Sequence, residues 1–273
     1  MHPAHPWPPD QVRTLTSLHL DLADEVAPGL VEGLYLHGSL GFGEWYDGRS
    51  DVDFVAVTAA RPDEATTARL RAVHERVGET FPRPAYDGLY VTWADLARPP
   101  ADCPDVPCTL AGEWRVGRVD LNPVTWHELA WHGVHVRGPA LDEVEVWTDT
   151  EALRAYSAAN LRDYWAERVR LLRQHPDEAA RPDIVEWFVL GVPRLHHAIV
   201  TGRLTSKDGA GHHAVATFGE RWRPVVAEAL TSRALGEPSG RYDGQEARLA
   251  EEVAAFAELV LETALAINVE LTK

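Results

Sequence analysis

Residues 34–57 constrain this chain more than any other stretch. An apolar run ends in Gly38-Ser39, a glycine-rich turn of about a dozen residues follows, and a second apolar run carries Asp51 and Asp53. Side chains at positions i and i+2 of an extended strand point to the same face, so we expect the two carboxylates to project together. Two negative charges at such a short distance need a counter-charge. Hard divalent cations, bound by the carboxylates and by substrate phosphates, supply it. The stretch therefore predicts a nucleotide-dependent phosphoryl-transfer site.

Each half of this pattern also has an ordinary structural reading. A Gly-Ser pair is a common turn, and an Asp-x-Asp pair on a half-exposed strand can be a solvated face. The combination, with Asp51 and Asp53 inside a Val/Phe/Val run, is more specific. It resembles the signature of the polymerase-beta-type nucleotidyltransferase superfamily. The resemblance implies that Asp51 and Asp53 hold Mg²⁺, with two ions expected, and that the backbone of Gly38 and Ser39 contacts the outer phosphates of the nucleotide.

Composition and charge narrow the range of partners. The chain has 273 residues, 45% of them hydrophobic and 25% charged, and a formal net charge of −16. The electrostatic field of so negative a protein repels nucleic acid and anionic membranes and attracts cations. No stretch of the sequence forms a basic patch. We therefore expect a small cationic acceptor and no nucleic-acid partner. With no apolar run as long as a membrane span and no signal-peptide pattern at the start, we expect no membrane partner and a cytoplasmic location.

Hydrophobic periodicity predicts an α+β chain with two domains. Up to residue 147 the pattern mixes helices and strands, which is typical of a core of helices on a mixed sheet. After that it becomes nearly continuous amphipathic helix, which predicts an all-α helical bundle. We therefore expect a nucleotidyltransferase domain at 1–147 and a helical domain at 148–273. The expected helices are 10–27, 63–80, 126–131, 152–174, 184–201, 222–235 and 245–271; the expected strands are 33–37, 52–58 and 88–93; and a proline-rich loop is expected at 99–111.

A third carboxylate is implied by the superfamily, which places an acidic residue on the next core strand as a base or metal ligand. Asp87, at the entry to the apolar run Gly88-Leu-Tyr-Val-Thr, is the candidate. The alternative is a turn residue that closes the loop of residues 82–84, because Asp-Gly is a frequent turn pair. The sequence leaves both readings open.

A narrower resemblance extends over most of the chain. Residues 112–114 (Gly-Glu-Trp), 135–139 (His-Val-Arg-Gly-Pro) and 200–208, together with Arg194, are similar to the aminoglycoside adenylyltransferases that modify streptomycin and spectinomycin. That resemblance implies ATP as co-substrate and a helical domain whose arginine and lysine, thirteen residues apart, contact the ATP phosphates. Arg194 and Lys207 match in type and spacing.

Acceptor contacts are less well defined. The resemblance implies that Trp114 contacts the drug, although a chain with ten tryptophans uses most of them for packing, and Lys207 has the alternative of a solvated loop lysine. The acceptor-binding carboxylates of the family have no clean counterpart, so Asp183 and Glu186 are candidates only. Asp87 stands where the family has a longer glutamate, which predicts slower chemistry or a different acceptor.

Three functions therefore remain open. The first is Mg²⁺-dependent transfer of AMP from ATP to a hydroxyl of a cationic small molecule of the aminoglycoside type. The second keeps this chemistry but uses a protein acceptor, as toxin and antitoxin pairs do, and the third is nucleotide binding without catalysis. Two other features carry no expected role: Cys103 and Cys108 are too few for a zinc site, and we interpret His37 as a strand-filling residue.

Overall fold

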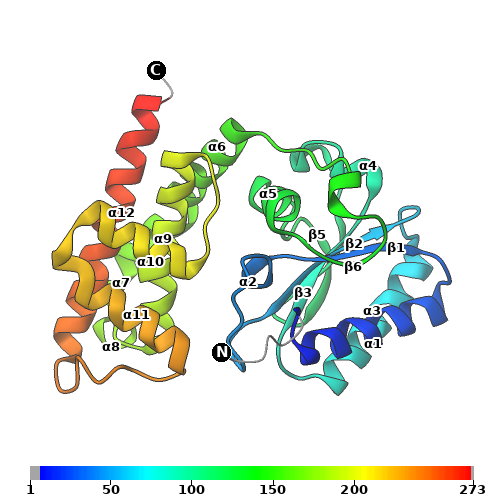
Figure 1. Ribbon diagram of the computed structural model, residues 1–273. Coiled ribbons are helices and arrows are strands. Elements are labelled where there is room, and N and C mark those ends of the chain that lie inside the picture. Colours follow the sequence, from blue (N-terminus) through cyan, green and yellow to red (C-terminus); the bar gives the residue numbers. More distant parts are fainter. Residues whose placement is uncertain (1–6, 272–273) are drawn as a thin grey trace. The chain divides into compact units, whose positions relative to one another are not determined.

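The α+β architecture expected from the sequence is the one that the protein adopts. A computed structural model describes residues 7–271, and the chain divides into two units, residues 1–148 and 149–273. Figure 1 shows an amino-terminal unit built around a sheet and a carboxy-terminal unit built of helices. Each unit has its own hydrophobic core.

The amino-terminal unit is organised by one six-stranded sheet with the strand order β5-β4-β3-β2-β1-β6. Strands β2 and β3 are parallel, and the other neighbours are antiparallel. A parallel pair needs a crossover between its strands, and helix α3 (Glu64–Thr80) supplies it. The strands are β1 (Val31–Leu36), β2 (Val52–Thr58), β3 (Tyr86–Thr92), β4 (Val106–Leu110), β5 (Glu113–Gly117) and β6 (Val134–Arg137).

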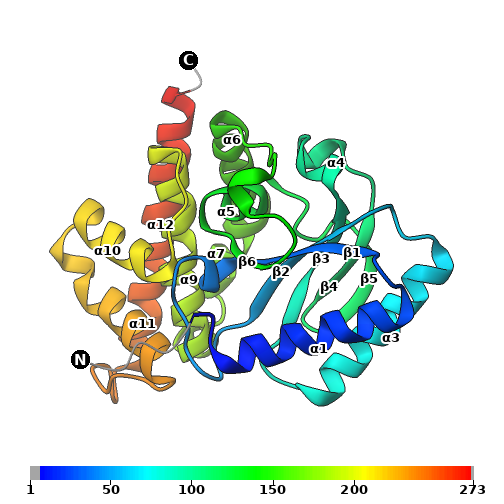
Figure 2. The same cartoon turned by 45° about the vertical axis from the view of Figure 1, so that its right-hand side comes forward.

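Helices cover both faces of this sheet (Figures 1 and 2). Helices α1 (Asp10–Val26) and α3 (Glu64–Thr80) pack on the face that carries Phe54 and Tyr90. The opposite face carries Val55 and Leu89 and packs against α4 (Trp93–Leu96) and α5 (Pro123–His132). Alternate residues of each central strand thus enter different cores, which explains why these strands read as continuous apolar runs.

The proline-rich segment 99–111 is more regular than the sequence predicts. It contains a short 3₁₀ turn, Pro100–Asp102, and then strand β4, which pairs with β3 only at Thr109 and Cys108. Pro107 lies beyond these two paired residues, so its missing N–H removes no ladder bond to β3. The expected loop is therefore partly a strand.

The carboxy-terminal unit is helical throughout its regular structure. Helix α9 is central and packs against α6, α10, α11 and α12. The helices are α6 (Thr150–Asn160), α7 (Ala166–Leu172), α8 (Pro176–Ala179), α9 (Pro182–Thr201), α10 (Lys207–Phe218), α11 (Arg223–Leu235) and α12 (Glu246–Leu271). Helix α10 was not expected, because Gly209, Gly211 and two adjacent histidines obscure its apolar face. A π-helical turn, Leu161–Trp165, interrupts the helix expected over 152–174.

Across residues 7–271, no helix combines the length and the apolar character needed to span a membrane. Cys103 and Cys108 are both buried free cysteines.

A buried polar network joins α1, α3 and β3 beneath the sheet. His19 bonds Tyr86 through Nδ1 (2.7 Å) and Tyr90 through Nε2 (2.6 Å), and His74 Nε2 bonds the same Tyr90 hydroxyl at 2.7 Å. Burial lowers the pKa of His19 to about 3, with a further lowering by Arg137 that Asp24 opposes. Both rings therefore stay neutral and link the helices to β3 by hydrogen bonds.

Titration of His19 makes the stability of the protein depend on pH. The unfolded chain binds a proton at His19 near pH 6.5, but the folded protein does so only near pH 3. The contribution of neutral His19 to the free energy of unfolding is therefore complete above pH 6.5 and is lost as the pH falls toward 3. We expect His19→Gln to reduce the slope of unfolding free energy against pH by about 1.4 kcal/mol per pH unit in this range. Urea denaturation at a series of pH values measures the slope, and an unchanged slope in the variant contradicts the assignment.

Candidate active site

Asp51 and Asp53 lie at the start of the central strand β2. The strand begins at Val52, so Asp51 is an exposed residue just before it and the expected strand alternation applies only to Asp53. Asp53 is half-buried and points to the same face as Val55, over the core that packs against α4 and α5. Asp51 nevertheless lies close enough to raise the pKa of Asp53.

The electrostatics of Asp53 are unusual for a strand residue. Burial raises its pKa to about 7; the charge of His37 opposes this shift, and Glu128, Asp120 and Asp51 add to it. A carboxyl group with such a pKa is only partly ionised at neutral pH unless a cation stabilises the charge. Asp120 has the same character, because burial first and then Glu128 and Asp87 raise its pKa while His37 lowers it. Four acidic side chains thus influence the site around Asp53.

The Gly38-Ser39 turn lies directly against this carboxylate. Gly38 opens a single helical turn, α2 (Gly38–Gly41), with φ of +60°, and a Cβ on it would lie 1.9 Å from Asp53 Oδ2. The backbone N–H of His37 also donates to the carbonyl of Asp53 at 3.0 Å. Only glycine permits both the left-handed backbone and this approach, so the glycine is required by geometry.

A buried glutamate and histidine complete the site, and the sequence did not indicate either of them. Glu128 of α5 accepts hydrogen bonds through one oxygen, Oε2, from His37 Nδ1 at 2.9 Å and from the N–H of Gly38 at 3.2 Å. Burial lowers the pKa of His37, but the bond to Glu128 and the charges of Asp53, Glu128 and Asp120 outweigh burial and raise it overall. The interpretation of His37 as strand filling was therefore wrong. No local signal joins residues 91 positions apart.

Asp87 is a strand residue beside Asp53. The two are direct partners in the parallel register of β2 and β3, so their side chains share a face. Both oxygens of Asp87 accept backbone N–H groups from the β4–β5 hairpin turn, at 2.8 Å from Ala111 and 3.0 Å from Gly112. Asp87 does cap a turn, but one in a distant hairpin rather than the loop of residues 82–84.

Trp114 lies on the other side of the sheet. Trp114 of β5 pairs with Thr109 of β4, and Thr109 in turn pairs with Gly88 of β3. All three residues therefore lie on the face of the sheet that packs against α1 and α3. The ring of Trp114 lies 5.1 Å from that of His74 and 5.9 Å from that of Tyr90. The structure therefore does not bring Trp114 together with Asp53.

The remaining predicted residues belong to the carboxy-terminal unit. Arg194 donates from Nε to the carbonyl of Thr205 at 3.2 Å, beside the start of α10, where Lys207 is the first helical residue. Lys207 Nζ lies 2.9 Å from Glu186 Oε1, the same oxygen that accepts from the buried Arg233 at 3.0 Å. Glu186 is thus committed within its own unit.

Asp183, the other carboxylate proposed for the acceptor, is exposed on the first turn of α9. It pairs with Arg181, 2.8 Å away, in a contact between near neighbours in the sequence. Arg194 contacts Thr205, two residues before Lys207, and Asp183 lies on the first turn of α9, three residues before Glu186.

The donor set around Asp53 suits a hard cation that also binds a substrate. Within residues 7–271, no three His, Cys, Asp or Glu side chains are grouped so that they could hold a metal ion. Mg²⁺ in phosphoryl-transfer sites commonly takes one or two carboxylates and completes its shell with water and substrate phosphates. Asp51 and Asp53 are two residues apart, and Asp53 lies against the turn at Gly38. Asp51 and Asp53 therefore fit Mg²⁺ bound together with a polyphosphate.

No protein-family model matches the chain, and no curated protein matches it. A solved structure does: the crystal structure of spectinomycin adenyltransferase AAD(9) from Enterococcus faecialis with ATP and spectinomycin. The chain has the fold of that enzyme. The TM-score is 0.60 at 12% sequence identity, and the match covers 90% of this chain and 98% of the other. At this identity the similarity establishes the fold, and the chemistry must be argued from the residues.

Two glycines provide a direct test of the packing at Asp53. Gly38 and Gly48 both have positive φ, +60° and +72°, but a Cβ at Gly48 meets nothing within 4 Å. We expect Gly48→Ala to cost about 1–2 kcal/mol of unfolding free energy for its backbone alone. Gly38→Ala should cost about 1–3 kcal/mol more, because it displaces a carboxylate. Equal losses in chemical denaturation would show that the turn does not press on Asp53.

Proposed function

We propose that this protein is a Mg²⁺-dependent nucleotidyltransferase that transfers AMP from ATP to a hydroxyl of a small cationic acceptor of the aminoglycoside type. One observation carries the proposal: the carboxyl group of Asp53, with Asp51 two residues before it, lies against the Gly38-Ser39 turn. The fold shared with an adenyltransferase crystallised with ATP and spectinomycin supports it.

The reaction is a substitution at phosphorus. The acceptor hydroxyl oxygen forms a bond to the α-phosphorus of ATP, the bond from that phosphorus to the bridging oxygen breaks, and pyrophosphate leaves. A pair of Mg²⁺ ions supplies neutralisation of the triphosphate charge when bound. Asp51 and Asp53 would hold these ions, and the backbone of Gly38 and Ser39 would orient the outer phosphates.

The proton of the acceptor hydroxyl goes to a carboxylate, and we propose Asp87 for this role. It lies beside Asp53 in the strand register. Its two hydrogen bonds from the hairpin turn occupy two of about four lone-pair positions and hold its orientation, which leaves capacity for a proton. A base with a fixed orientation favours proton transfer at one site of the acceptor.

The helical unit contributes further candidates by resemblance. We propose Arg194 and Lys207 as phosphate-binding residues; Lys207 would exchange its contact with Glu186 for phosphate. For the acceptor, the net charge of −16 favours a cation. Asp183, which is exposed, is a better candidate for contact with it than the buried Glu186, and Trp114 has a packing role instead.

The metal ligands are tested by nucleotide binding. We expect ATP to bind in calorimetry only with Mg²⁺ present, because the acidic site repels a bare triphosphate. Asp53→Asn should weaken binding of Mg²⁺-ATP by about a hundredfold or more and abolish AMP transfer, since it removes a charged ligand. Asp87→Asn should leave binding within about threefold of wild type and slow transfer about a hundredfold or more. Equal binding of ATP with and without Mg²⁺ would refute the proposal.

The acceptor is tested by label transfer. ATP labelled in the α-phosphate is incubated with the protein and a panel of aminoglycosides, and in parallel with cell lysate. We expect label on a small cationic molecule and none on a polypeptide. Label on a polypeptide would favour the protein-acceptor reading, and Mg²⁺-dependent binding without any transfer would favour a non-catalytic nucleotide-binding protein.

A further inference from the structure

Glu128 contacts the turn at Gly38 through a single oxygen atom. One carboxylate oxygen, Oε2, accepts both the side-chain Nδ1–H of His37 and the backbone N–H of Gly38. Glu128 and His37 are 4% and 5% exposed, so neither side chain can readily exchange this contact for one with bulk water. A buried carboxylate is kept only where its oxygens have partners, and two consecutive residues, His37 and Gly38, are among them here.

This geometry determines that Nδ1 of the His37 ring carries a proton. Because the carboxylate of Glu128 can only accept when it is ionised, the proton on the facing nitrogen is at Nδ1. The other nitrogen, Nε2, is buried and has no hydrogen-bond partner among residues 7–271. The contact of His37 with Glu128 therefore depends on Nδ1 alone.

We propose that Glu128 and His37 are positioning residues that hold the Gly38-Ser39 turn in its nucleotide-binding conformation. Gly38 has a left-handed backbone, and the glycine lies against Asp53. Left-handed backbone in a glycine is flexible unless other contacts determine it. Glu128 supplies such contacts from α5, on the face of the sheet that carries Asp53. These contacts determine the position of the next residue, Ser39.

This inference rests on the proposed nucleotide site and is measured by nucleotide binding rather than by turnover. The amide nitrogen of asparagine occupies the place of histidine Nδ1, whereas that of glutamine occupies the place of Nε2. His37→Asn therefore keeps the donor to Glu128, and His37→Gln removes it. We expect the affinity for Mg²⁺-ATP in calorimetry to stay within about threefold of wild type in His37→Asn and to fall about tenfold or more in His37→Gln, as expected for loss of a charge-assisted hydrogen bond.

Glu128→Gln tests the other partner. A glutamine keeps the shape and one acceptor oxygen but loses the charge that both donors share. We expect Mg²⁺-ATP affinity to fall about tenfold, and His37→Gln to add little to this loss in the double variant, because both substitutions remove the same contact. Additive losses would mean that the two residues act separately.

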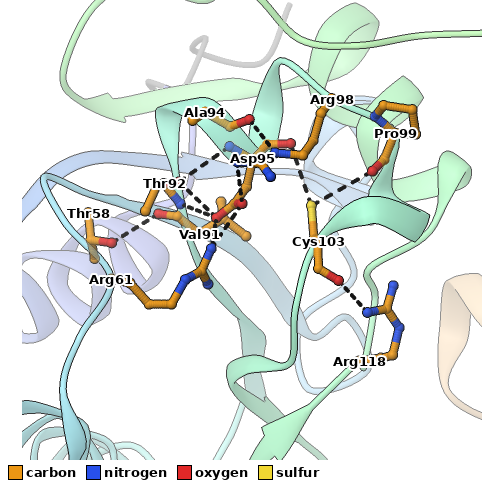
Figure 3. Close-up of polar contacts among 10 residues, drawn as sticks. All are labelled: Thr58, Arg61, Val91, Thr92, Ala94, Asp95, Arg98, Pro99, Cys103 and Arg118. Carbon is orange, nitrogen blue, oxygen red and sulfur yellow. Dashed lines mark hydrogen bonds and ion pairs between the residues drawn. The ribbon is translucent and has the colours of Figure 1, made fainter.

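Asp95 provides a matched control in the same unit (Figure 3). It is fully buried, accepts two hydrogen bonds from Arg61 at 3.0 and 2.8 Å, and bonds Thr92 at the start of α4. It follows the carboxyl end of β3, whereas Asp87 lies at the amino end, so the two sites are at opposite ends of one strand. Asp95→Asn should lower the thermal midpoint while leaving the affinity of the folded protein for Mg²⁺-ATP unchanged.

The outcomes separate the inference from the function on which it rests. If wild type fails to bind Mg²⁺-ATP, the proposed function is wrong. If wild type binds and His37→Gln binds equally well, or His37→Asn is the weaker of the two, the positioning role is refuted. If Asp95→Asn weakens binding as much as Glu128→Gln, the effect of Glu128 is one of general stability.

Discussion

The repulsion among carboxylates at the amino end of β2 is the constraint on which the rest of this site depends. Asp53 is drawn out of water by its position on a core-facing side of the sheet, and Glu128, Asp120 and Asp51 make its ionisation still less favourable. His37 is the nearby group that opposes this effect. A protein would gain stability by replacing such a group with an apolar one. The arrangement is understandable if a cation, bound together with a polyphosphate, supplies the missing positive charge during function.

The two faces of the sheet divide packing from chemistry. On the face of α1 and α3, His19, His74 and two tyrosines form a neutral hydrogen-bonded network against which Trp114 packs. On the other face, the side chains at the same end of the strands are charged. The period of two in a strand produces this division, since Tyr86 and Asp87 are neighbours in sequence and point to opposite sides. A single residue step therefore separates a structural role from a candidate catalytic one.

The features that could be predicted from the sequence are those whose signal lies within one short stretch of residues. The Gly-Ser turn and the central strands were visible because glycine and apolar runs report on their own backbone. Strand β4 was hidden by prolines whose effect depends on which neighbour is paired, and α10 by glycines within its pattern. Glu128 could not be found, because a single glutamate on a helix has no pattern that indicates a partner 91 residues away.

By itself the sequence determined the α+β class, the three central strands, most of the long helices and the presence of two acidic residues after a Gly-Ser turn. Hydrophobic period and turn chemistry act over a few residues and need no tertiary context. Only the tertiary structure decided which acidic groups meet: it brought Asp87 beside Asp53, bound Glu128 to His37 and Gly38, and turned Trp114 away. Strand register and helix docking set these contacts, and both are settled by burying the whole core at once rather than by any one segment.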